Sequence, residues 1–178
     1  MVMSKNIKPE TIKMNILALI LFFIPSFIFI IIQIKLSPFV YIKKDFSIIL
    51  TIILVPLIHE FLHFVGFIIF GKLKPNQLIF KSNESSPLPY FRTNIPLNKN
   101  DYILVLLLPC MILICISICL ALIYGNILFS VIIGYSLSMS AGDISLAIIL
   151  LKLNTTNKIV PFTDELGFTI FNDTHEVF

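Results

Sequence analysis

The stretch HEFLH, residues 59–63, lies inside an apolar run that extends over about residues 46–70. A helix through this run places His59 and His63 four residues apart, so both imidazoles project from one face. Two histidines at this spacing can share a metal ion, and Glu60 is near enough to reach a water on that ion. Packed core histidines beside a structural carboxylate are the alternative. Because ionisable groups in an apolar span are costly and usually functional, we interpret the stretch as half of a metal site.

The composition indicates a membrane protein. Of the 178 residues, 57% are hydrophobic and only 13% are charged, whereas about a quarter of a soluble domain is charged. The net charge of +3 is small and the basic residues lie between the apolar runs, so nothing indicates nucleic-acid binding. The three cysteines form no Cys-x-x-Cys pair, and we interpret them as apolar packing residues.

Four apolar runs are long enough to span a bilayer, which takes about 20 residues. They extend over about residues 14–33, 46–70, 102–124 and 127–151, and a polar tail follows at 152–178. The first run is too long for a secretory signal and lacks a small-residue cleavage site, so we expect it to be retained. The sequence therefore predicts an all-α membrane protein, with one polytopic domain over residues 1–178 built as a four-transmembrane-helix bundle.

The polar segment from Lys72 to Asp101 joins the second and third runs. It holds four prolines, which disfavour a helix. Residues 78–80 and 90–93 are candidates for short β-strands. An exposed strand edge here would pair with an extended peptide substrate, and a solvated connector is the alternative.

Lys and Arg are unevenly distributed over the polar segments. With four spans, the N-terminus, the 72–101 loop and the tail lie on one side and hold ten of them, against three opposite. The positive-inside rule makes the richer side cytoplasmic. We therefore predict a multi-pass protein of the cell membrane, in contact with the lipid bilayer, with both termini and the 72–101 loop in the cytoplasm.

Depth in the bilayer predicts a third metal ligand. The second and fourth spans run in the same direction, so distances from their cytoplasmic ends can be compared. At about 1.5 Å per residue, His63 lies roughly 10 Å, His59 roughly 16 Å and Asp143 roughly 12 Å from that end. Small residues near Asp143 permit close helix contact. We infer that Asp143 is the third ligand; the alternatives are that Asp143 caps or pairs elsewhere, or that His175 in the tail binds instead.

This ligand set is typical of a catalytic zinc site, because two imidazoles and a carboxylate leave a fourth tetrahedral position for water. Zn²⁺ is favoured by the mixed nitrogen and oxygen donors and by the lack of a redox partner. Glu60 would be the general base, taking a proton from zinc-activated water and passing it to the leaving amine. The oxyanion donor stays open among Tyr135, Ser136, Ser138 and Ser140.

Three segments together resemble a known family: HEFLHFVGFIIFG (59–71), SMSAGDISLAIILLKL (138–153) and DELGFTIF (164–171). They are similar to a family of small bacterial membrane zincin peptidases, of the site-2 protease type of intramembrane metalloprotease. The resemblance implies that His59, His63 and Asp143 bind zinc and that Glu60 is catalytic. In the larger site-2 group the Asp precedes a Gly and follows an Asn and a Pro, whereas here Gly142 precedes Asp143.

Together these observations predict an intramembrane zinc metalloprotease that hydrolyses a peptide bond of a membrane-associated protein or peptide. A non-proteolytic zinc-binding accessory protein or sensor is the second interpretation. A small transporter, with its buried charges along the path, is the third. The sequence does not identify the substrate, the physiological role or the oligomeric state.

Overall fold

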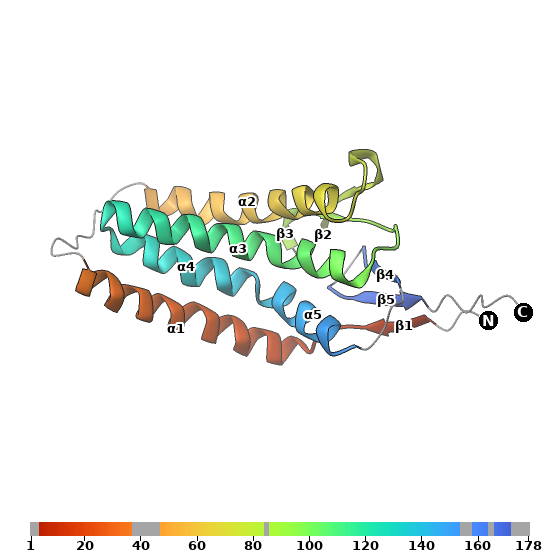
Figure 1. Ribbon diagram of the computed structural model, residues 1–178, viewed down its shortest axis with the longest axis horizontal. Coiled ribbons are helices and arrows are strands. Elements are labelled where there is room, and N and C mark those ends of the chain that lie inside the picture. Colours follow the sequence, from red (N-terminus) through yellow and green to blue (C-terminus); the bar gives the residue numbers. More distant parts are fainter. Residues whose placement is uncertain (1–3, 37–46, 84–85, 154–157, 164–165, 172–178) are drawn as a thin grey trace, which may run out of the picture. The chain divides into compact units, whose positions relative to one another are not determined.

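The computed structural model describes residues 4–36, 47–83, 86–153, 158–163 and 166–171 (Figure 1). Within these residues the chain is mostly helical. The helices are α1 (Thr11–Leu36), α2 (Ser47–Ile69), α3 (Lys99–Tyr124), α4 (Ile127–Met139) and α5 (Ala141–Lys152). The strands are β1 (Ser4–Ile7), β2 (Ile79–Asn83), β3 (Ser86–Arg92), β4 (Lys158–Pro161) and β5 (Phe168–Phe171).

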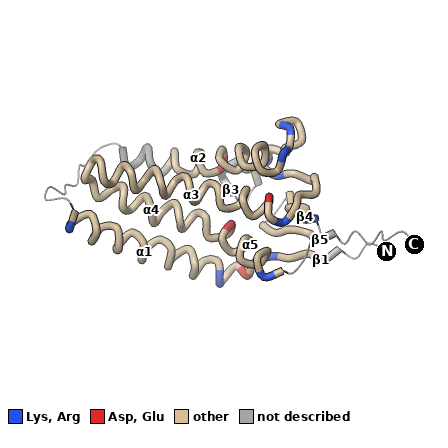
Figure 2. Tube along the Cα trace, viewed as in Figure 1, with Lys and Arg blue, Asp and Glu red and all other residues tan. Residues whose placement is uncertain are grey.

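Two of these helices, α1 and α3, are long and apolar enough to cross a membrane, and the bent pair α4–α5 would make a third. Figure 2 shows why: the charged residues of α1 and α3 lie only near the helix ends. Helix α2 forms over the expected range, and the part of it with described side chains, Ile53–Ile69, is apolar but shorter than a span.

The chain divides into two compact units. The first, called here the mixed unit, comprises Met1–Glu10, Glu60–Leu108 and Gly142–Phe178. The second, the helical unit, comprises Thr11–His59 and Pro109–Ala141. Helices α2 and α3 each run unbroken from one unit into the other.

In the helical unit, α1 packs against α4 at a glycine. A Cβ atom built on Gly134 would collide with the Ser26 Oγ and the Phe22 carbonyl oxygen of α1. Near the end of α1, the buried Gln33 side chain makes two hydrogen bonds. Its Oε1 accepts from Ser130 Oγ of α4 at 2.7 Å, and its Nε2 donates to the Ala121 carbonyl of α3 at 3.2 Å. Gly134 lets the two apolar helices approach closely, because it has no side chain. The hydrogen bond between Gln33 and Ser130 also holds α1 against α4.

Replacing Gly134 by Ala is expected to destabilise this helix pair by about 1–3 kcal/mol, because a methyl group has no space between the two backbones. Thermal unfolding of the protein in detergent measures the loss. Ser138→Ala, on the same helix at a half-buried position, is the matched control and should leave the midpoint unchanged. An unchanged midpoint in Gly134→Ala would contradict this packing.

The mixed unit has one continuous hydrophobic core, which holds together the segments that carry the candidate site. The sheet order is β1-β5-β4, antiparallel throughout, with Ile7 and Pro161 both opposite Phe168. Side chains of this sheet pack with side chains from α2, α3 and α5; among the most buried are Phe67, Val105, Leu146, Leu150, Ile159 and Phe168. At the end of α5 the Lys99 ammonium group donates to the Leu153 carbonyl at 3.0 Å. The start of α3 is thereby tied to the end of α5.

Strands β2 and β3 form an antiparallel hairpin between α2 and α3. They overlap the two short strands expected at residues 78–80 and 90–93. The hairpin is held to α2 by the Phe91 ring, whose centroid lies 4.9 Å from that of Phe64. The cytoplasmic location of this segment stays a prediction.

The fourth expected span, residues 127–151, is two helices instead of one. Helix α4 ends at Met139, α5 begins at Ala141, and the pair is bent by 52°. Ser140 explains the bend. Its Oγ donates to the Ser136 carbonyl at 3.0 Å, and its backbone N–H donates to the same carbonyl at 3.2 Å. Such back-bonding by serine bends helices.

The expected polar tail is also corrected in part. Residues 152–178 contain β4, which is one edge of the three-stranded sheet, and β5, which is its central strand. Strand β1 lies in the N-terminal segment, where no element was expected. The rival ligand His175 and most of the loop between the first two spans lie outside the described residues.

Candidate metal centre

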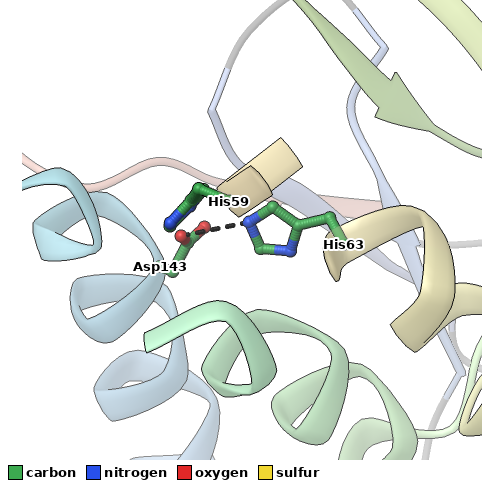
Figure 3. Close-up of side chains that lie close together, drawn as sticks. All are labelled: His59, His63 and Asp143. Atoms are coloured by element: carbon green, nitrogen blue, oxygen red, sulfur yellow. Dashed lines mark hydrogen bonds and ion pairs between the residues drawn. The ribbon is translucent and has the colours of Figure 1, made fainter. Parts of the chain in front are cut away.

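The three predicted ligands lie together (Figure 3). His59 and His63 come from adjacent turns of α2 and are each 3% exposed; Asp143 comes from the first turn of α5 and is 6% exposed. One ligand atom from each residue can be chosen so that all three atoms lie within 4.8 Å of one another. His59 is the last residue of the helical unit, and the unbroken helix α2 fixes its position relative to His63.

The orientation of His63 is set by α3. Its Nδ1 atom lies 3.1 Å from the Val105 carbonyl oxygen, which can only accept, so Nδ1 carries a proton and donates it. This leaves Nε2 toward Asp143, whose Oδ2 atom is 3.2 Å away. Metal-binding histidines are commonly held in this way, with the second ring nitrogen donating to a carbonyl.

Two sequence features make that carbonyl accessible. Pro109 lies four residues after Val105 and has no N–H group, so the Val105 carbonyl lacks its usual helical donor. On the facing helix, a Cβ atom on Gly66 would lie 3.3 Å from Val105 Cα. The glycine therefore lets the α3 backbone come close to α2, and the proline leaves its carbonyl free for His63.

Replacing Pro109 by Ala should restore the helical donor to Val105 and weaken the hold on His63. We expect zinc affinity to fall by about 10-fold, the lower end of the range for such supporting contacts. The helix itself should be no less stable, because an interior proline is removed. Zinc titration and thermal unfolding of the same sample measure both. Pro25→Ala in α1 is the control, and a lowered unfolding midpoint in Pro109→Ala would contradict the interpretation.

Asp143 owes its position to the break after α4. The helix restarts at Ala141, so Asp143 lies in the first turn of α5, where the helix dipole favours a carboxylate. A continuous helix through Ser140 would have placed Asp143 in a helix interior. The bend therefore produces a buried negative group beside His63.

Glu60 follows His59 and has a buried oxygen, Oε2, with no hydrogen-bond partner among the described residues. Its position directly after His59 puts the carboxylate on the helix that carries two of the three candidate ligands. A buried carboxylate oxygen without such a partner is unusual in a folded protein, and it is available to accept a hydrogen bond from a bound molecule.

The donor set fits zinc. His63 Nε2 and Asp143 Oδ2 are 3.2 Å apart, and two ligands of a tetrahedral zinc ion with bonds near 2.1 Å are about 3.4 Å apart. With Nδ1 donating to Val105, only a proton on Nε2 or a cation between the two atoms makes this approach favourable. A zinc ion would be held by His59, His63 and Asp143.

The four candidate oxyanion donors lie in or next to α4. Ser140 is engaged with the Ser136 carbonyl. Ser136 is fully buried, and its Oγ has no hydrogen-bond partner among the described residues. Tyr135 and Ser138 are half-buried. These residues belong to the helical unit, and the donor stays unassigned.

Sequence reasoning missed the Val105 carbonyl, which orients His63. The proline four residues after Val105 was a usable signal for the carbonyl.

Comparison with known proteins gives one match. A family described as "Putative zincin peptidase" matches residues 52–157, which include both histidines, Glu60 and Asp143. No curated protein and no solved structure matches the chain.

Proposed function

This chain belongs to the zincin peptidase family that matches it over residues 52–157, and from this we propose that it is an intramembrane zinc metalloprotease. Its reaction is hydrolysis of a peptide bond in a membrane-associated protein or peptide. The protein lies in the cell membrane as a multi-pass protein with both termini in the cytoplasm, as the distribution of Lys and Arg indicates.

One observation supports the proposal above the others: the approach of His63 Nε2 to Asp143 Oδ2 while Nδ1 is committed to a carbonyl. A cation between the two atoms makes this approach favourable, and a proton on Nε2, which would make a buried ion pair, is the alternative. The three ionisable residues lie within apolar helical segments of the sequence, and ionisable groups in such segments are usually functional. The carboxylate of Glu60, whose buried Oε2 has no hydrogen-bond partner in the described part of the chain, favours catalysis over metal storage, because storage needs only the ligands.

The residues of the chain have distinct roles in this mechanism. Zinc, when bound, lowers the pKa of its water to about 7 and polarises the scissile carbonyl. Glu60 accepts the water proton and later delivers it to the leaving amine. His63 keeps its orientation through Val105, and Asp143 supplies the negative charge that a divalent cation requires.

The test combines metal analysis with proteolysis. Purified protein is expected to contain one zinc per chain by atomic absorption, and to cleave single-span model peptides in liposomes. A chelator should abolish cleavage, and Zn²⁺ but not Mg²⁺ should restore it. Cleavage that survives complete zinc removal would refute the proposed mechanism, and zinc without any cleavage would favour the accessory-protein interpretation.

A further inference from the structure

A cavity of about 190 Å³ lies in the helical unit, between α1, α3 and α4. Its lining residues on α1 extend from Phe29 to Leu36, so the cavity occupies the last two turns of that helix. Those on α3 extend from Ile118 to Leu122. All of the lining residues belong to the helical unit, and the cavity is open on one side.

The wall of this cavity is apolar, although Gln33 and Ser130 contribute to it. The Gln33 amide accepts from Ser130 Oγ and donates to the Ala121 carbonyl, so these polar groups are already engaged with one another. A buried water needs two to four polar partners, and an apolar cavity of about 150 Å³ stays dry and takes up a small hydrocarbon. A pocket for a drug-sized ligand has at least about 300 Å³. The volume and the wall therefore fit a short stretch of hydrocarbon chain.

The open side of the cavity lies among exposed apolar side chains. Ile32, Leu36 and Leu122, which line the cavity, are 39%, 66% and 62% exposed. Only Ser26 and Gln33 are buried on α1, so this helix has little packing within the protein. Because α1 and α3 are both long and apolar enough to cross a membrane, the hydrocarbon next to these side chains is that of lipid acyl chains.

A positive charge lies at the same end of α1 as the cavity. The described part of the helical unit contains no Lys, Arg, Asp or Glu other than Lys13 and Lys35. These two lysines are 22 residues apart on α1, which corresponds to about 33 Å, and the hydrocarbon core of a bilayer is about 30 Å thick. Lys35 is exposed and directly precedes the lining residue Leu36. An α1 that spans the bilayer therefore puts Lys35 at the level of the lipid phosphates, with the cavity just inside the hydrocarbon.

We propose that the cavity binds one acyl chain of a phospholipid whose phosphate group contacts the Lys35 ammonium. Lysine binds phosphate as a point charge, and the acyl chain supplies the dispersion contacts that an empty cavity lacks. The bound lipid fills the space between α1, α3 and α4 and holds α1 in place. This site does not depend on the proposed peptidase function.

The experiment titrates delipidated protein in detergent with two lipids that have the same chains, dioleoylphosphatidylglycerol and dioleoylglycerol. Native mass spectrometry counts the bound lipids. We expect one phosphatidylglycerol per chain, bound about 5-fold more tightly than dioleoylglycerol, which has no phosphate for Lys35 to contact. The phospholipid should also raise the thermal unfolding midpoint, because it binds only the folded protein. Absence of bound phospholipid, or equal affinity for the two lipids, would overturn the proposal.

Two substitutions test the two parts of the site. Ala121→Met puts a flexible side chain into the cavity and should remove binding of both lipids. Ala18→Met on α1, which is outside the lining, is the matched control and should keep it. Lys35→Gln should lower the affinity for phosphatidylglycerol to that for dioleoylglycerol, whereas Lys13→Gln at the other end of α1 should not. Because Lys35 is exposed, this variant tests the site even if Ala121→Met does not fold.

The same spectra distinguish the other possible occupants of the cavity. Phospholipid binding that Ala121→Met and Lys35→Gln leave unchanged would place the lipid elsewhere on the protein and overturn the proposal. A dimer that Ala121→Met dissociates would show that a second copy of the chain fills the cavity, and would overturn it as well.

Discussion

Glu60→Gln is expected to abolish peptide hydrolysis while the purified protein keeps its full zinc content. The substitution keeps the size and polarity of the side chain but removes its ability to accept a proton. General acid–base catalysis contributes about 10²–10⁴-fold, so the rate should fall by at least that factor. Cleavage of a model membrane peptide in liposomes and zinc analysis of the same preparation measure the two effects together.

The matched control is Glu10→Gln, an exposed carboxylate near the N-terminus, which should leave both quantities unchanged. If Glu60→Gln still cleaves at more than one-tenth of the normal rate, Glu60 is not the general base. If it loses zinc as well, Glu60 supports the metal site instead of the chemistry.

Asp143→Ala is expected to lower zinc affinity by at least 100-fold, a larger loss than the 10–100-fold typical of supporting residues outside the ligand set. The carboxylate is the only charged group among the three candidate ligands, and its loss also removes the partner of His63 Nε2. Competition with a chelating dye measures the affinity, and cleavage should be lost in parallel.

Asp101→Ala is a closely matched control, because Asp101 also lies in the first turn of a helix, α3. It should keep normal zinc affinity. Stoichiometric zinc in Asp143→Ala would remove Asp143 from the ligand set, and the tail residue His175 would then be the next candidate.

The sequence alone was sufficient to predict that His59, His63 and Asp143 lie together. Four-residue spacing puts His59 and His63 on one helical face, and the fixed rise of a helix let Asp143 be matched to their depth. The first inference depends on helix geometry alone, whereas the second also assumes that the two helices run in the same direction through a bilayer, which stays a prediction. The structure places the three side chains together, and their role as metal ligands stays a prediction.

The break at Ser140 and the three-stranded sheet could not be predicted in the same way. Serine is tolerated in helices, and the bend depends on the rotamer that directs Ser140 Oγ to the Ser136 carbonyl. Strands β1, β4 and β5 have four residues each, too few for a clear alternation of apolar and polar residues. Their stability comes from partners distant in the sequence, such as Ile7 opposite Phe168.

The pairing of β1 with β5 has a topological consequence. Two strands cannot pair across a bilayer, so Ile7 and Phe168 must lie on the same side of the membrane. The chain between them therefore crosses the membrane an even number of times. Three crossings, by α1, α3 and α4–α5, are therefore ruled out for a chain inserted in a membrane. Either α2 adds a fourth, or α4–α5 enters and leaves on the same side. The exposed Lys74, just after α2, shares a compartment with the termini only in the first case, and an impermeant amine reagent distinguishes the two.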